Sequence, residues 1–108
     1  MRILLLAFTL FTNMYASVSQ GKLIYKKECL SCHIEGKYLA STKKAKEWKE
    51  LLIENEKSNK LAQLHFSIKK TDEDWSYFKQ KDYLQDSNHL KNLLQKYSSD
   101  RGKHNSCY

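Results

Sequence analysis

The segment 29–33 reads CLSCH, with two cysteines three positions apart and a histidine directly after the second. Cys29, Cys32 and His33 could serve three kinds of chemistry. The thiols could supply half of a zinc site, form a redox-active dithiol, or attach a c-type haem whose iron is bound by the histidine. The five residues alone leave all three alternatives open.

A structural zinc site needs four ligands, which commonly come from two paired groups of cysteines or histidines. The remaining candidates in this chain lie far apart, and none forms a pair such as CxxC or HxxxH; they are His65, His89, His104 and Cys107. A zinc site would therefore be irregular, and the sequence disfavours it.

A thioredoxin-like dithiol stands at the start of a helix, after an apolar strand, within a βαβ unit. Here Lys26, Lys27 and Glu28 precede the motif and form a charged stretch that favours a helix. The remaining sequence shows no βαβ pattern, so the dithiol interpretation is also disfavoured.

Haem attachment fits the motif and its context. The two thiols add to the two vinyl groups of haem, and the adjacent histidine binds the iron. Cys29 and Cys32 would carry the thioether bonds of a single haem c, and His33 would be its proximal ligand. Attachment takes place in an oxidising compartment after export, so this interpretation also requires an export signal.

Residues 1–19 have the layout of such a signal. Arg2 provides a positive start, an apolar run of about ten residues follows, and small residues occupy positions near 16–19. The run is too short to span a bilayer, which takes about twenty residues. We expect cleavage after Ala16 or after Ser19, and a periplasmic protein with no transmembrane segment once the signal is removed.

Composition bounds the rest of the chain. With 108 residues, three glycines and no proline, the sequence favours a single all-α domain over residues 20–108. A mature chain of about 90 residues builds only a thin core, which a buried cofactor would supplement. The net charge of +7 favours acidic partners, whereas the dispersed lysines and the export signal disfavour nucleic acid. Cys107, the remaining cysteine, could form an intermolecular disulfide, act as a reactive thiol or bind a metal, or it could have no role.

Periodicity predicts helices that position the motif. One helix would begin with Ser19 as its cap and run into the motif, with Gly21, Tyr25 and Cys29 on one face. A loop is expected over 34–40, and an apolar segment of uncertain type over 61–66. Further helices would begin at Ser41 or Thr42 (with Ala45, Trp48, Leu51 and Leu52), at Thr71 (with Trp75 and Phe78), and at Asp86 or Ser87 (with Leu90, Leu93, Leu94 and Tyr97).

The stretch GKLIYKKECLSCH resembles the start of the small class I cytochrome c family, in which a helix with a glycine and an aromatic residue leads into CxxCH. In that family this helix packs across a C-terminal helix rich in leucine and aromatic residues. Gly21, Tyr25 and the motif itself match the first part, and the second helix is matched by Leu90, Leu93, Leu94 and Tyr97. The resemblance implies about four to five helices wrapped around one covalent haem. It also implies electron transfer between redox proteins, without catalysis.

The sequence departs from the family pattern on the distal side of the iron. Members use a downstream methionine there, but Met1 and Met14 both lie in the predicted signal. His65 and His89 are equal candidates for the distal ligand, and His104, Cys107, a lysine or an open site are the others. Histidine in place of methionine would lower the reduction potential. An open site would instead indicate a small-ligand sensor or a peroxidase-like protein.

Overall fold

The computed structural model describes residues 16–52, 59–68 and 75–101. In these ranges the chain forms helices and no strand, which confirms the predicted all-α class. Residues 16–28 form an N-terminal helix; α2 (Gly36–Ala40), α3 (Ala45–Leu51), α4 (Lys60–Phe66), α5 (Ser76–Lys79) and α6 (Lys81–Lys96) follow. In the same ranges, no helix has the length and apolar character that a membrane span requires.

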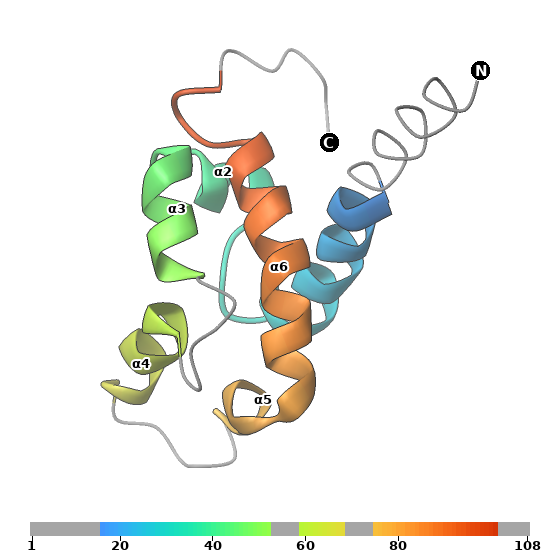
Figure 1. The fold of residues 1–108 in the computed structure, drawn as a ribbon, viewed down its shortest axis with the longest axis vertical. Coiled ribbons are helices and arrows are strands. Elements are labelled where there is room, and N and C mark those ends of the chain that lie inside the picture. Colours follow the sequence, from blue (N-terminus) through green and yellow to red (C-terminus); the bar gives the residue numbers. More distant parts are fainter. Residues whose placement is uncertain (1–15, 53–58, 69–74, 102–108) are drawn as a thin grey trace, which may run out of the picture.

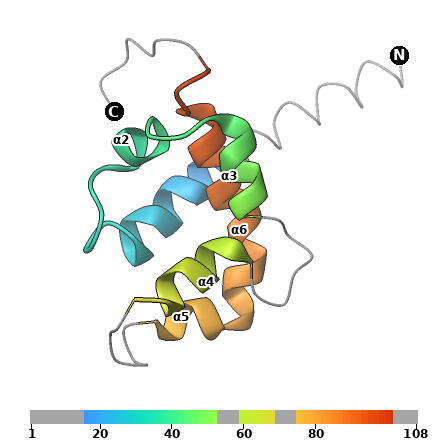
Figure 2. The ribbon, with the colours of Figure 1, turned by 90° about the vertical axis from the view of Figure 1, so that its left-hand side faces the viewer.

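Helix α6 is the element on which the others pack. It contacts α2, α3 and α5, and Figure 1 shows it between α3 and the N-terminal helix. Figure 2 shows α4 and α5 together at the lower end of the molecule. The predicted apolar face of Leu90, Leu93, Leu94 and Tyr97 is buried, as expected from its three-to-four spacing.

The predicted start of this last helix at Asp86 or Ser87 is wrong, because α6 already begins at Lys81. Gln80, with an extended backbone (φ −79°, ψ 147°), separates it from α5. The Ser87 hydroxyl lies inside the helix and donates to the carbonyl of Leu84 at 2.9 Å. Tyr83 and Ser87 continue the buried face by about two further turns. The polar serine interrupts the apolar pattern, so the sequence does not show this continuation.

The N-terminal helix crosses α6 at Gly21. A Cβ atom at this position would lie 2.4 Å from the carbonyl oxygen of His89 and 2.9 Å from the Cβ of Leu93, so the crossing requires glycine. The predicted face is confirmed, since Gly21 and Tyr25 are buried and Cys29 is half-buried. Ser19 is not the cap, because the helix already includes residue 16.

The segment before α3 is more ordered than predicted. Residues expected to form a loop over 34–40 include α2, whose last residue Ala40 is fully buried and accepts a hydrogen bond from the indole N–H of Trp48 at 2.9 Å. Ser41 and Thr42 do not begin the next helix; their hydroxyls donate back to carbonyls of α2. Tertiary packing of Ala40, rather than local propensity, explains this short helix.

The segment of uncertain type over 61–66 is helical. It forms α4, and the side-chain oxygen of Asn59 caps it by accepting the Ala62 N–H at 3.1 Å. The predicted helix start at Thr71 lies outside the described residues, and the described α5 begins at Ser76. His104 and Cys107 lie outside the described residues as well.

Candidate functional site

The motif turn, residues 29–33, follows directly from the N-terminal helix. The N–H of Cys29 donates to the Tyr25 carbonyl at 2.8 Å, and the N–H groups of Cys32 and His33 both donate to the Cys29 carbonyl, at 3.1 and 3.0 Å. Cys29 is half-buried, whereas Cys32 and His33 are exposed. The three predicted site residues therefore occupy one tight turn, two of them open to solvent.

Tyr25 fixes the chain that leaves this turn. Its hydroxyl donates to the Ile34 carbonyl, and a Cβ at Gly36 would lie 3.4 Å from its ring. Burial and the proximity of Cys29 raise the pKa of Tyr25 to about 12, so the hydroxyl remains a donor at neutral pH. The segment after His33 is thus held against the N-terminal helix.

Cys29 is in the wrong environment for a redox-active dithiol. Burial, with smaller contributions from Glu28 and Cys32, raises the pKa of the Cys29 thiol to about 12. Reactive dithiols need the opposite shift, because the thiolate is the nucleophile. A helix rather than a strand leads into the motif. The structure thus gives the dithiol interpretation no support.

His65 lies opposite His33. Their ring centres are 6.0 Å apart and their planes are nearly perpendicular, at 82°. Partial desolvation of the imidazole by the protein atoms around it, with a smaller contribution from His65, lowers the pKa of His33, which favours the neutral imidazole that binds metals. Of the two candidate partners predicted for His33, the structure therefore brings one into contact with it.

The position of His65 is fixed by α4 and by aromatic neighbours. Its Nδ1 lies 2.7 Å from the Leu61 carbonyl, one helical turn earlier. Phe78 stacks on its ring at 4.3 Å, and Trp75 meets it edge-on at 5.2 Å. Phe78 and Trp75, predicted as the buried face of a helix, are half-buried here and form part of this site.

His89, the other candidate, lies elsewhere. Its Nδ1 is 2.8 Å from the Ser17 hydroxyl, and its carbonyl borders Gly21. Residues 21 and 29 are about 12 Å apart along the N-terminal helix at roughly 1.5 Å per residue. The structure thus places His89 at the helix crossing, away from the motif turn.

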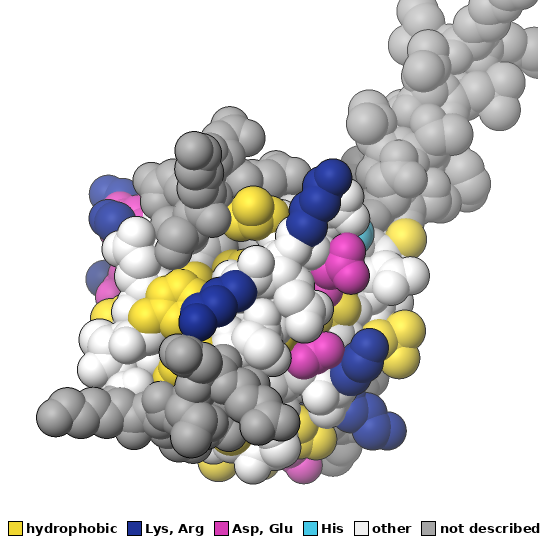
Figure 3. Space-filling view, turned by 90° about the horizontal axis from the view of Figure 1, so that it is seen from below, with side chains coloured by type: hydrophobic (Ala, Val, Ile, Leu, Met, Phe, Trp, Pro, Cys, Tyr) yellow, Lys and Arg dark blue, Asp and Glu magenta, His cyan; other side chains and the backbone are white. Residues whose placement is uncertain are grey.

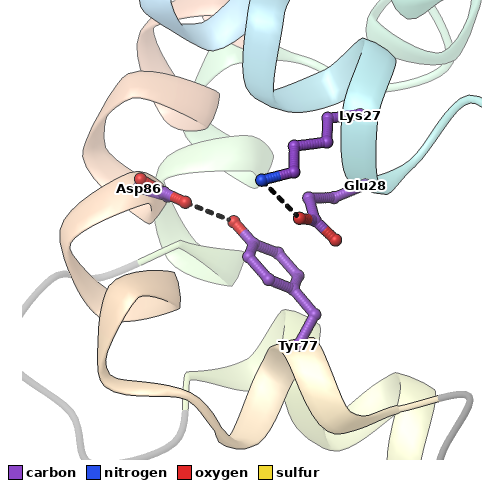
Figure 4. A network of polar contacts seen from close by, with 4 residues as sticks. All are labelled: Lys27, Glu28, Tyr77 and Asp86. Carbon is purple, nitrogen blue, oxygen red and sulfur yellow. Dashed lines mark hydrogen bonds and ion pairs between the residues drawn. The ribbon is translucent and has the colours of Figure 1, made fainter.

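Several polar side chains near the motif turn were not singled out from the sequence. The Tyr77 hydroxyl donates to Asp86 at 2.8 Å and joins α5 to α6, and the Lys27–Glu28 ion pair, at 3.9 Å, lies nearby (Figure 4). Burial, followed by the hydrogen bond to Asp86, raises the pKa of Tyr77. No local sequence pattern marks Tyr77, because its partner lies nine residues away.

A second polar contact joins α4 to α6. The Tyr83 hydroxyl donates to the side-chain oxygen of Asn59 at 2.5 Å, and both residues are fully buried. The Asn59 amide nitrogen has no acceptor among the described residues. An asparagine shortly before an apolar run is a cap signal, and Asn59 lies two positions before Leu61, so the sequence contains a marker for it.

The zinc alternative finds no support in the described part of the chain. Within residues 16–52, 59–68 and 75–101, no group of three or more His, Cys, Asp or Glu side chains is arranged to hold a metal ion.

Comparison with known proteins finds no family model that matches the chain, no curated protein similar to it and no solved structure that matches it.

Proposed function

We propose that the chain is an exported monohaem c-type cytochrome that carries single electrons between redox proteins in the periplasm. The observation that carries this proposal is the CLSCH turn, which presents two thiols and a histidine at the end of a well-packed helix. Cys29 and Cys32 would hold the haem, and His33 would bind its iron. When bound, the iron would supply one-electron redox chemistry.

The attachment needs no further reactant beyond reduced thiols and haem. Each thiol adds across one vinyl group, so that a sulfur–carbon bond forms while the S–H bond and the vinyl double bond are lost. The hydrogen passes to the other vinyl carbon, and no net oxidation takes place. Cys29 and Cys32 are not joined to each other, which is the state that this addition requires.

The surroundings of the turn fit a large apolar cofactor. Ile34, next to His33, is 60% exposed, and Ile68, three residues after His65, is 53% exposed. Further exposed apolar side chains flank the same two histidines; these are Leu30, Leu64 and Phe66. A macrocycle between His33 and His65 would cover part of this exposed apolar surface. Figure 3 views the end of the molecule formed by α4 and α5, where hydrophobic side chains lie exposed beside basic ones.

The buried Asn59 amide supports the same proposal. Its nitrogen lacks an acceptor among the described residues, and such a buried donor costs roughly 1–3 kcal/mol. A chain of contacts links Asn59 to the site. Asn59 accepts the hydrogen bond of Tyr83, and the Tyr83 ring lies edge-on to the Phe78 ring with their centres 5.0 Å apart. Phe78 in turn stacks on His65. A haem propionate is an acceptor of the kind that this donor needs.

Electron transfer also agrees with the surface charge. Lys26, Lys27 and Lys79 are exposed on the elements that carry the site, and the whole chain has a net charge of +7. Basic side chains near a redox centre steer an acidic partner toward it and raise the association rate. We therefore propose redox partners with acidic docking surfaces.

The proposal is tested by staining for haem after denaturing electrophoresis of the protein exported by a bacterial host that attaches c-type haem. Only covalent haem survives denaturation, so we expect a stained band. Two matched controls should be colourless: a Cys29→Ser/Cys32→Ser variant, and a chain that lacks the predicted signal. A colourless band for the exported wild-type chain would overturn the proposal.

A further inference from the structure

We propose that His65 is the second protein ligand of the haem iron, opposite His33. This inference rests on the proposed function and deepens it. Two imidazoles bound to one metal atom from opposite sides, with metal–nitrogen bonds of about 2 Å, have ring centres roughly 6 Å apart. The observed separation of the two rings is 6.0 Å.

The hydrogen bond of His65 leaves the correct nitrogen available. The Leu61 carbonyl, 2.7 Å from Nδ1, can only accept a hydrogen bond, so the proton of the neutral ring resides on Nδ1. Nε2 then carries no proton, and its lone pair is available to bind a metal. Metal-binding histidines show this arrangement, in which a carbonyl or carboxylate bound to one nitrogen orients the other toward the metal.

The aromatic contacts of His65 hold the ring in place. Phe78 stacks on one face at an interplanar angle of 26°, and Trp75 approaches at 71°. The Trp75 indole N–H donates to the Ile68 carbonyl at 3.2 Å, which ties the end of α4 to the start of α5. A ligand fixed in this way needs little reorganisation between the two oxidation states of the iron.

His89 already has a different role in the fold. Its Nδ1 is hydrogen-bonded to the Ser17 hydroxyl, and its backbone carbonyl lies against Gly21 where the two helices cross. A move of His89 to the motif turn would break both contacts. The choice between His65 and His89 that the sequence leaves open is therefore decided by tertiary contact.

Ligation by His65 has functional consequences. It closes the iron to carbon monoxide, dioxygen and peroxide, which favours electron transfer over ligand sensing or peroxidase-like chemistry. It also places the reduction potential below that expected for a methionine ligand.

The test compares absorption spectra of the haem-loaded wild-type protein, a His65→Ala variant and a His89→Ala control in both oxidation states, with and without carbon monoxide. We expect low-spin spectra that carbon monoxide does not shift for the wild type and His89→Ala. His65→Ala should become high-spin and bind carbon monoxide, and added imidazole should restore the low-spin spectrum. A His65→Met variant that keeps a low-spin spectrum should have a higher potential than the wild type.

The outcomes separate the two proposals, because haem attachment uses Cys29 and Cys32 and does not depend on His65. Stained bands together with an unchanged His65→Ala spectrum, or a wild type that binds carbon monoxide, would overturn the His65 assignment alone. The same holds if His89→Ala, rather than His65→Ala, becomes high-spin. Colourless bands for all three proteins would overturn both the assignment and the proposed function.

A second inference concerns the N-terminus of the mature chain and rests on different residues. Ser17 is only 8% exposed; its hydroxyl lies 2.8 Å from Nδ1 of His89 and accepts the Asn92 side-chain N–H at 2.7 Å. Cleavage after Ser19 would remove this serine and leave Gly21 as the second residue of the chain. We infer that the signal is removed between Ala16 and Ser17, so that the helix crossing stays intact.

The mass of the N-terminal proteolytic peptide of the exported protein tests this inference. We expect that the peptide begins at Ser17. A peptide that begins at Val18 or later, or one that retains Ala16, would overturn it. This measurement is independent of haem, because the peptide up to Lys22 contains no cysteine.

Discussion

The two ends of the N-terminal helix differ in how completely the rest of the protein covers them. Near Gly21 the helix lies against α6 so closely that no side chain fits between them, and Leu93 of α6 is buried there. At the other end, the motif turn exposes Cys32 and His33, and apolar side chains around it remain uncovered. Protein side chains alone cover the first region, whereas the second leaves exposed the apolar side chains that the proposed haem would cover.

The largest effect is expected in the first region. Leu93→Ala should reduce the free energy of unfolding by about 2–5 kcal/mol, because it leaves a cavity beside Gly21. Leu23, on the exposed side of the N-terminal helix at 65% exposure, provides the control, and Leu23→Ala should cost less than about 0.5 kcal/mol. Urea unfolding of the exported proteins measures both. Equal costs would contradict the described packing.

Glycine substitutions should sharpen the contrast. Gly21→Ala should cost about 1–3 kcal/mol, since the new Cβ meets backbone of α6 and outweighs the gain in helix propensity. Gly36→Ala adds a Cβ at ordinary contact distance from the Tyr25 ring and should change stability by less than about 0.5 kcal/mol. Thermal unfolding of the two variants should therefore give clearly different midpoints, and coincident midpoints would argue against the close crossing.

The second region is tested by comparing Ile68→Ala with Leu23→Ala. Both side chains are more than half exposed, at 53% and 65%, so protein contacts alone predict similarly small costs. If a macrocycle covers Ile68 in the exported protein, its truncation should cost about 1 kcal/mol more than that of Leu23. Indistinguishable unfolding curves would indicate that nothing covers this side chain.

The smallest effect concerns Asp100, which joins the start of α3 to the chain that follows α6 by a hydrogen bond. Asp100 accepts the Ala45 N–H at 2.9 Å and the Ser98 hydroxyl at 3.0 Å, and these bonds lower the pKa of its carboxyl. A lowered folded-state pKa stabilises the fold above the unfolded pKa, and this stabilisation is lost as pH falls through the folded value. Asp100→Asn should therefore slightly lower the unfolding temperature at pH 7, and its difference from wild type should shrink below pH 4. A difference that grows toward low pH would contradict this.

The sequence predicts regular, periodic features well. The face of Leu90, Leu93, Leu94 and Tyr97, and the face of Gly21, Tyr25 and Cys29, both have helical spacing and are both confirmed. The apolar pattern does not predict the start of α6 correctly, because Ser87 interrupts it. The Ser87 hydroxyl is nevertheless hydrogen-bonded within the helix. Helix α2 has no local signal, since it depends on the burial of Ala40.

The candidate site also contains residues that the sequence predicts and one that it does not single out. Cys29, Cys32 and His33 are adjacent in the sequence, so their grouping could be predicted. His65 lies 32 positions beyond His33, and no sequence pattern distinguishes it from His89. Only the packing of α4 and α5 against the motif turn places His65 opposite His33, with Phe78 and Trp75 around it.

The intact mass of the exported protein after denaturation shows directly whether haem is covalently bound to the chain. Haem joined through Cys29 and Cys32 would remain on the polypeptide, whereas any noncovalent group would be lost. We expect a mass equal to that of the polypeptide plus one haem. A mass equal to the bare polypeptide, from a host that attaches haem to other c-type cytochromes, would contradict it.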